Sequence, residues 1–383
     1  MSRRESRMEV DLPGKIELIA DLPGHEDKAW HVAWNPARPL LASCSADKTV
    51  RLYHYNTIST SDTSDSSSSL KFELNTSIAT GHTKTVRGIA WSPSGQTLAT
   101  ASFDANIGIW QQEEDEDGEA ENNVNGGGEW ECVSLLEGHE TECKSVAYSS
   151  TGTLLASCSR DKTVWIWEVH PDADFECMGV LMEHSQDVKC VAWHPTEEIL
   201  ASASYDDTIK LYQDDPSDDW FCATTLTGHT STVWSIAWEP KEGGYLASSS
   251  DDRTIRIWRR LPGKGDISFE CAAVIEGHER SVYSISWAPA PEKEAVKDAG
   301  GKNLGWLAST GGDGTVLIWQ INEVPGEPDK SPKIEQTLLA RLDAAHGVHD
   351  LNAIAWCPRA GMDGIFATAG DDGHTKVWKL ILS

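Results

Sequence analysis

The stretch LASCSRDKTVWIW, residues 155–167, decides how this chain folds. Two short runs of small, β-branched and aromatic residues flank Arg160, Asp161 and Lys162, which is the pattern of a β-hairpin with a tight turn. The Asp of this turn lies four residues after Ser157 and six residues before Trp167. Hydroxyl, carboxylate and indole groups at this spacing predict a polar network, because such groups are costly when they are buried without partners.

The same spacing occurs seven times along the 383 residues. The Asp and aromatic pairs are Asp47/Tyr53, Asp104/Trp110, Asp161/Trp167, Asp206/Tyr212, Asp252/Trp258, Asp313/Trp319 and Asp372/Trp378. The Ser or Thr four residues before each Asp are Ser43, Thr100, Ser157, Ser202, Ser248, Ser309 and Thr368. The His that begins each unit is His25, His82, His139, His184, His229, His278 or His346. Seven units in register indicate a repeat architecture.

A unit with His, Ser or Thr, Asp and an aromatic residue in this order resembles the WD40 repeat. The resemblance implies an all-β, seven-bladed WD40 β-propeller, whose blades stack because one four-stranded blade cannot bury both of its faces. Residues 1–14 are expected to be a flexible N-terminus and residues 15–383 a single propeller. The strand KIELIA, residues 15–20, is expected to complete the last blade beside residues 376–382, which removes an open sheet edge.

Four inserts lengthen the repeat, at residues 56–69, 111–128, 288–303 and 321–333. Their compositions, rich in Ser, Asp, Glu, Gly or Pro, predict mobile loops, and the acidic segment 113–121 has no assigned role. All four fall between the first and second or the third and fourth strands of a blade, connections that share one face. The other connections stay short, so we expect a binding surface on the opposite, restrained face.

Two positions in each blade are expected to point up at this restrained face. The position four residues before the first-strand aromatic is Trp30, Arg87, Lys144, Lys189, Trp234, Tyr283 or Asn352. The position before the turn Asp is Ala46, Phe103, Arg160, Tyr205, Asp251, Gly312 or Asp371. The predicted partner-binding residues are Arg160, Arg87, Lys144, Lys189, Phe103, Tyr205, Trp30, Trp234 and Tyr283. Cations beside aromatic side chains suit a short acidic or carboxylate-ended segment.

Composition excludes several classes of partner. The net charge is −28, from 60 acidic and 32 basic residues, so nucleic acid and anionic membranes would be repelled. No apolar run is long enough to span a membrane. The first ten residues lack the apolar segment of a secretory signal, and the nine cysteines therefore suggest a reducing compartment.

Neither the cysteines nor the histidines predict a metal or catalytic site. Cys132, Cys177, Cys222 and Cys271 occupy one position in four different blades, so they cannot converge on one ion, and we expect them to be structural core residues. Cys44 and Cys158 share another such position, while Cys143 and Cys190 are the least excluded pair. No zinc, phosphate-loop or nucleophile motif occurs. We therefore expect no enzyme activity, no cofactor, no metal and no small-molecule substrate.

The segments SCSRDKTVWIWE (157–168), EHSQDVKCVAWHP (183–195) and ASASYDDTIKLY (201–212) are similar to a narrower group. They resemble the WD40 subunits of the cytosolic iron–sulfur protein assembly (CIA) targeting complex. The resemblance implies a non-catalytic scaffold that helps to transfer iron–sulfur clusters to cytosolic and nuclear apo-proteins. The implied partners are a DUF59-family subunit, a HEAT-repeat adaptor, an iron-only hydrogenase-like cluster carrier and apo client proteins. The implied location is the cytoplasm, with the nucleus as a second option.

The same resemblance marks two positions. A functional surface arginine of the third blade matches Arg160. Animal relatives carry a Leu-Tyr-Arg tripeptide proposed to meet a co-chaperone, and the matching residues here are Leu211, Tyr212 and Gln213, which puts that contact in doubt. Two other functional classes are less favoured. A WD40 substrate receptor or chromatin-associated scaffold would bind basic tails and needs an acidic rim, to which only Asp251 and Asp371 would contribute. A metallochaperone would need converging cysteines, which the spacing disfavours.

Overall fold

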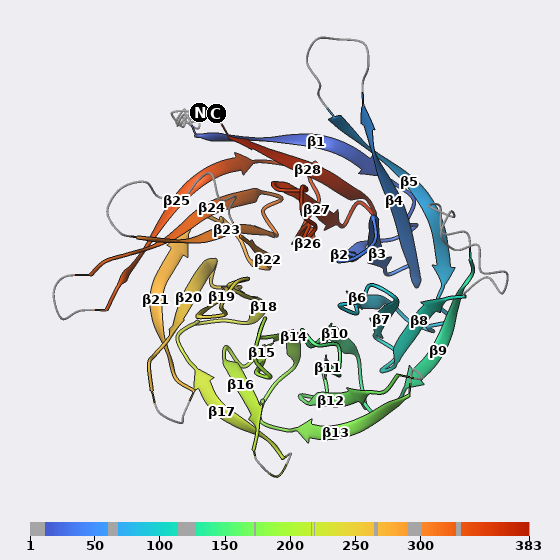
Figure 1. Cartoon of the computed structure of the whole chain (residues 1–383), viewed down its shortest axis with the longest axis horizontal. Helices are drawn as coiled ribbons and strands as arrows, with labels where there is room; N and C mark the ends of the chain where they lie inside the picture. Colours follow the sequence, from blue (N-terminus) through green and yellow to red (C-terminus); the bar gives the residue numbers. More distant parts are fainter. Residues whose placement is uncertain are drawn as a thin grey trace, which may run out of the picture.

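The chain folds into seven four-stranded antiparallel sheets that stand around a central axis (Figure 1). This is the seven-bladed propeller that the repeats predict. The computed structural model describes residues 12–59, 68–113, 128–171, 174–215, 217, 219–263, 267–289, 301–326 and 331–382. The expected flexibility of residues 1–14 therefore falls, for residues 1–11, outside the described residues. Among the described residues, no helix has the length and hydropathy needed to cross a membrane.

Each blade runs from an inner first strand to an outer fourth strand, and we number the blades in chain order (Figure 1). Blade 1 is β2 (Ala29–Trp34), β3 (Leu40–Ser45), β4 (Thr49–Ser59) and β5 (Ser68–Ala79). Blade 2 is β6 (Val86–Trp91), β7 (Thr97–Ser102), β8 (Ile107–Gln112) and β9 (Trp130–Leu136). Blade 3 is β10 (Cys143–Tyr148), β11 (Leu154–Ser159), β12 (Val164–Val169) and β13 (Phe175–Leu181). Blade 4 is β14 (Val188–Trp193), β15 (Leu200–Ser204), β16 (Ile209–Asp214) and β17 (Trp220–Leu226).

The remaining blades follow the same plan. Blade 5 is β18 (Val233–Trp238), β19 (Tyr245–Ser250), β20 (Thr254–Arg260) and β21 (Phe269–Glu276). Blade 6 is β22 (Val282–Ala288), β23 (Lys302–Gly311), β24 (Val316–Val324) and β25 (Lys333–Leu342). Blade 7 is β26 (Leu351–Trp356), β27 (Ile365–Gly370), β28 (Thr375–Leu382) and, as its outer strand, β1 (Gly14–Leu22).

The pairing of β1 with β28 closes the ring, as expected. The register runs from Gly14 opposite Leu382 to Leu22 opposite Thr375, with one irregularity between Leu18 and Ala20. The first and the last described strands therefore share one sheet (Figure 1). This pairing satisfies backbone groups that an open edge would leave exposed.

The hydrophobic core lies between the blades. Leu52 of blade 1, for example, packs in one cluster with Ile89 and Trp91 of blade 2, and fully burying an aliphatic side chain of this size contributes about 1.5–3 kcal/mol. The Trp91 indole Nε1 also donates a hydrogen bond of 3.1 Å to the Ala33 carbonyl of the preceding blade. The first-strand tryptophans Trp34, Trp193, Trp238 and Trp356 donate to the preceding blade in the same way.

The expected polar network is present in blade 3. The Asp161 carboxylate accepts from His139 Nδ1 at 2.9 Å, and His139 Nε2 lies 2.9 Å from Ser157 Oγ. Ser157 Oγ in turn accepts from Trp167 Nε1 at 3.0 Å. Burial alone would raise the pKa of Asp161, but hydrogen bonds from His139 and Thr163 outweigh it, so the pKa lies well below the ordinary range. The turn, the second strand and the third strand are thereby tied to one buried chain of hydrogen bonds.

The terminal link of this network varies between blades. The hydroxyl residue also accepts from the indole in blades 2, 5 and 7, and in blade 4 the Ser202 hydroxyl donates to Tyr212 Oη instead. In blade 6 the buried Trp319 Nε1 has no hydrogen-bond partner among the described residues, so the expectation of an indole link is wrong there. The His–Asp and His–hydroxyl links of that blade remain, at 2.9 and 2.8 Å.

The inserts lie between the strands where they were expected, but their boundaries were wrong. β4 continues to Ser59 and pairs with β5 from Ser68, so both ends of the insert 56–69 belong to a long hairpin. β24 extends to Val324 and β25 begins at Lys333, and the side chain of Ile321 is buried at the start of that insert. Strands also take in residues 111–112, 288 and 302–303. The central parts of all four inserts, including most of the acidic segment 113–121, lie outside the described residues.

Candidate functional site

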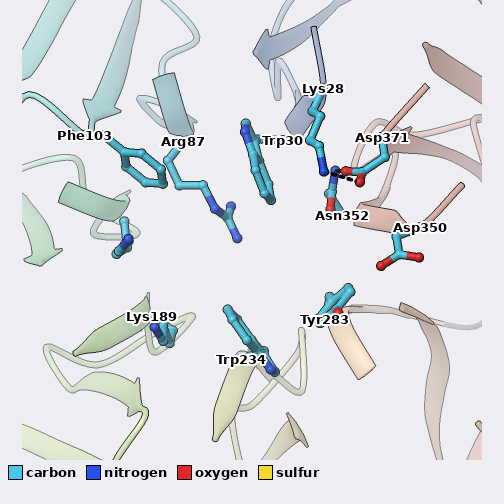
Figure 2. A pocket seen from close by; sticks show the side chains of 11 residues that line it. Lys28, Trp30, Arg87, Phe103, Lys189, Trp234, Tyr283, Asp350, Asn352 and Asp371 are labelled. Carbon is cyan, nitrogen blue, oxygen red and sulfur yellow. Dashed lines mark hydrogen bonds and ion pairs between the residues drawn. The ribbon is translucent and has the colours of Figure 1, made fainter. Parts of the chain in front are cut away.

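A pocket of about 320 Å³ opens at the axis on the restrained face (Figure 2). All seven blades contribute to it, through the beginnings of the first strands and the short connections around them. The lining residues are Lys28, Trp30, Arg87, Phe103, Lys144, Lys189, Trp234, Tyr283, Asp350, Asn352 and Asp371. This volume is at the low end for ligand sites, so the pocket suits a short segment or a few side chains.

A β-bulge places the first-strand residue of each blade in this pocket. The pairing of β6 with β7, for example, skips from Val86 to Gly88 and leaves Arg87 without a partner in the ladder. The residues left out in the other blades are Trp30, Lys144, Lys189, Trp234, Tyr283 and Asn352. A bulge re-aims the side chain of the extra residue. The same local irregularity, repeated seven times, therefore builds the ring of side chains around the axis.

The structure brings together seven of the nine residues predicted from the sequence. Trp30, Arg87, Phe103, Lys144, Lys189, Trp234 and Tyr283 line the pocket. Arg160 and Tyr205 do not line it. The Arg160 side chain is 58% exposed, and its guanidinium lies 3.2 Å from Glu142. Tyr205 is 54% exposed, and its ring lies 5.2 Å from Lys189 Nζ. These two residues therefore form an outer shoulder on blades 3 and 4.

The basic wall of the pocket, which we define as Arg87, Lys144 and Lys189, is held by aromatic rings. The Arg87 guanidinium lies 4.8 Å from the Trp30 ring and Lys144 Nζ lies 4.1 Å from the Phe103 ring. Lys189 Nζ lies 5.1 Å from the Trp234 ring. Contacts of this kind position a cation without neutralising it.

Burial disfavours the charged forms of two members of the basic wall. Burial lowers the pKa of Arg87. Burial also lowers the pKa of Lys144; the nearby charges of Lys189 and Arg87 lower it further, and the hydrogen bond from Lys144 to Glu142 opposes this shift. Lys144 and Lys189 each have a carboxylate partner, Glu142 and Asp187. No hydrogen bond or ion pair joins the Arg87 guanidinium to another residue that the structure describes. Arg87 is therefore the member of the wall whose charge has no carboxylate partner among the described residues.

An acidic wall, Asp350 and Asp371, faces the basic wall across the pocket (Figure 2). Asp371 is fully engaged, because its carboxylate pairs with Lys28 and accepts 2.9 Å from Asn352 Nδ2. The Asp350 carboxylate has no hydrogen bond or ion pair with any described residue. Burial raises the pKa of Tyr283 between the two walls, and the charges of Asp350, Asp251 and Asp371 raise it further.

The restrained face carries more acid than the sequence reading counted. Only Asp251 and Asp371 were expected, but Glu142, Asp187 and Asp350 lie there as well. These residues share a third periodic position, two residues before the bulged residue, which is Lys28, Thr85, Glu142, Asp187, Thr232, Ser281 or Asp350. That periodicity could have found them. The surface is thus divided by sign, and the expectation that Asp251 and Asp371 are its only acids is wrong.

The cysteines differ in burial, and the expectation of core residues holds for only some of them, with Cys222 half-buried. Cys44 and Cys158 are fully buried in second strands, and burial raises the pKa of the Cys44 thiol to about 12. Cys132, Cys177 and Cys271 are exposed, so a core role for them is wrong. They lie on β9, β13 and β21, the outer strands of their blades, where one face of the strand meets solvent. Repetition in the sequence marks equivalent positions but does not say whether they are buried.

Two further groups of residues lie outside the pocket. Glu168, His170 and Glu176 at the outer end of blade 3 place their ligand atoms within 4.8 Å of one another, a grouping that depends on cross-strand register. Leu211 and Tyr212 are buried in blade 4, and Tyr212 Oη accepts from the Ser202 hydroxyl at 3.3 Å. This burial gives the Leu211–Gln213 segment a structural role in the blade.

Comparison with known proteins agrees with this architecture. The family model described as WD domain, G-beta repeat matches residues 16–54, 75–111, 130–168, 175–213, 220–259 and 269–320. A protein of Mycosarcoma maydis named probable cytosolic iron-sulfur protein assembly protein 1 is 50% identical, over 96% of this chain and 94% of that protein. A protein of the same name from Cryptococcus neoformans is 43% identical, over 96% of this chain and 99% of that protein.

A more distant relative extends the series. A protein of that name from Aspergillus terreus is 36% identical, over 95% of this chain and 98% of its own length. The propeller, the repeat matches and these near full-length similarities agree with one another. The chain belongs to the WD40 repeat family and, within it, to the family of cytosolic iron-sulfur protein assembly protein 1.

Proposed function

We propose that this chain is a non-catalytic scaffold of the cytosolic iron–sulfur protein assembly machinery. The observation that carries the proposal is similarity of 43–50% identity, along nearly the whole chain, to proteins named for that assembly. The scaffold joins a DUF59-family subunit to a HEAT-repeat adaptor. It helps an iron-only hydrogenase-like carrier to deliver clusters to apo-proteins in the cytoplasm and, as a second location, in the nucleus.

The pocket and its shoulder are the surface through which this scaffold contacts acidic segments of partners or clients. Arg87 supports this, because a half-buried guanidinium with unused donors gains most from a carboxylate, which it binds in a bidentate manner. Arg160 extends the surface outward on blade 3. A short acidic segment alone would bind in the micromolar range, about −8 kcal/mol, and other subunits would strengthen the complex through multivalency.

A complementation experiment tests the pathway. Yeast cells depleted of their own relative receive this chain, and the activities of one cytosolic and one mitochondrial iron–sulfur enzyme are measured. We expect the cytosolic activity to return while the mitochondrial activity stays constant throughout. Failure to restore the cytosolic enzyme, or an affinity-purified complex without iron–sulfur assembly subunits, would overturn the proposal.

A charge reversal tests the surface. Arg160→Glu should weaken capture of the partner subunits at least tenfold, and the loss should grow smaller in high salt because these charges are exposed to solvent. Lys241→Glu is the matched control, since it makes the same change in an exposed residue of the connection between β18 and β19, on the other face. Equal capture by both variants would show that this face does not bind the partners.

A further inference from the structure

The pocket carries two unpaired charges of opposite sign, Arg87 and Asp350, on opposite sides (Figure 2). Among the described residues, every other charged group of its lining has a partner of opposite sign. Lys144 pairs with Glu142, Lys189 with Asp187, and Lys28 with Asp371. The geometry therefore leaves one positive and one negative charge in the described lining without a partner, and both are available to an occupant.

Two tryptophans line the pocket on either side of the space between these two charges (Figure 2). The Trp30 ring stands between Arg87 and Lys28, at 4.8 and 6.0 Å from their cationic groups. On the other side the Trp234 ring lies 5.1 Å from Lys189 and meets the Tyr283 ring edge-on at 5.4 Å. Trp234 Nε1 is held by Asp251 at 2.5 Å, so this ring has a fixed orientation. The rings form an apolar strip between the basic and the acidic wall.

We propose that the occupant of this pocket is a dipolar peptide segment of a partner protein. It places an acidic group on Arg87 and a basic group on Asp350, and its backbone crosses the strip between Trp30 and Trp234. The proposal rests on the proposed function, because it gives the charge pattern of the acidic segment that the scaffold binds. A segment that carries only acidic groups would leave Asp350 unpaired and would be repelled by the acidic wall.

Asp350 is also the acid that can discriminate between occupants. A new cation competes with Lys28 and Asn352 for the Asp371 carboxylate, whereas Asp350 has no such ligands to displace. Gly312 keeps the space beside it open, because a Cβ there would lie 3.2 Å from Tyr283 Oη and 3.5 Å from Asp350 Oδ2. Charge complementarity at both ends makes recognition specific, because the wrong charge at either end is penalised.

A display selection tests the proposal without assuming a peptide sequence. A library of random octapeptides is selected on the purified full chain and, in parallel, on Arg87→Gln and Asp350→Asn. Glu140→Gln is the matched control, because it removes a charge from an exposed side chain of the same face that is not part of the pocket. We expect acidic and basic residues to be enriched together at a fixed spacing on the wild type and the control. Arg87→Gln should lose the acidic residue and Asp350→Asn the basic one.

The best selected peptide is then labelled with a charge-neutral dye, and its affinity for the chain is measured. The same is done for two versions of the peptide in which its basic or its acidic residue is replaced by Gln. Asp350→Asn should weaken binding of the dipolar peptide about tenfold, which corresponds to about 1.4 kcal/mol. The affinity for the acid-only peptide should stay within about twofold of the wild-type value. If dipolar and acid-only peptides bind the wild type equally, the dipolar inference is wrong and acidic recognition stands. If Arg87→Gln changes no enrichment, or nothing is enriched on the wild type, acidic recognition fails as well.

Discussion

The contact between Gly243 and His194 offers a sharp test of how blades 4 and 5 are joined. Gly243 has a φ of 65°, and its carbonyl accepts 3.2 Å from His194 Nε2 of the neighbouring blade. The His194 ring is 1% exposed and packs edge-on against Trp238 at 4.8 Å. A Cβ on Gly243 would lie 2.0 Å from His194 Nε2, closer than any non-bonded contact allows. Gly243→Ala must therefore displace a buried ring.

Three effects set the magnitude. A side chain at this positive φ costs about 1–2 kcal/mol, and an extra methyl group in a packed site costs about 1–3 kcal/mol. Losing the hydrogen bond to His194 costs a further amount of about 0.5–1.5 kcal/mol. Because the ring can relax in part, we expect Gly243→Ala to lower the free energy of unfolding by about 3–5 kcal/mol.

The neighbouring residue supplies the control. Gly244 has no atom within 4 Å of an added Cβ and no positive φ, so Gly244→Ala should be neutral or should stabilise by about 0.4–1 kcal/mol. Both variants are unfolded in urea and followed by tryptophan fluorescence and far-ultraviolet circular dichroism, whose transitions must coincide for the free energies to be comparable. Equal midpoints for the two variants would refute the reasoning.

Three further predictions follow from the polar networks and the thiols. Asp161→Ala leaves His139 Nδ1 and two backbone N–H groups without their acceptor. It should lower the free energy of unfolding, measured in urea, by about 2–4 kcal/mol, whereas the control Glu140→Ala should lower it by less than about 0.5 kcal/mol. The pKa of every turn Asp is lower in the folded chain than in the unfolded chain. The charged carboxylates therefore stabilise the fold fully above about pH 4, and this stabilisation is lost as the pH falls from there through the pKa values of the folded state. A midpoint of urea unfolding that is equal at pH 6 and pH 3 would contradict this. In the native protein a thiol reagent should modify the exposed cysteines Cys132, Cys177 and Cys271, and modification of the buried Cys44 or Cys158 at the same rate would show that the core opens readily.

Periodicity accounts for what the sequence could predict. The Asp, His and hydroxyl positions recur at fixed spacing because each blade solves the same problem of burying polar groups, so one blade identifies the others. The pairing of β1 with β28 also follows, since residues 15–20 are the strand that the count of blades leaves over, and the last blade, whose third strand is residues 376–382, lacks a fourth. Seven of the nine predicted site residues reach one pocket for the same reason.

The remainder depends on contacts that periodicity does not carry. Asp350 is the acid without a partner because Lys28 pairs with Asp371, and that pair joins residues 343 positions apart. The exposure of Cys177 depends on which strand ends the blade, and the extent of β4 depends on its pairing with β5. The bulges at Arg87 and its equivalents are register effects, invisible until both strands are placed.

The pairing of β1 with β28 has a consequence for synthesis on the ribosome. The strand β1 is made long before its partner β28, and at about 5–20 residues per second the interval between them is roughly 20–70 s. During that time blade 7 does not exist, and β1 offers an unpaired edge to whatever chain is nearby. The edge of β1 therefore stays open to aggregation for the whole of this interval, and a ribosome that stalls between β1 and β28 prolongs the exposure.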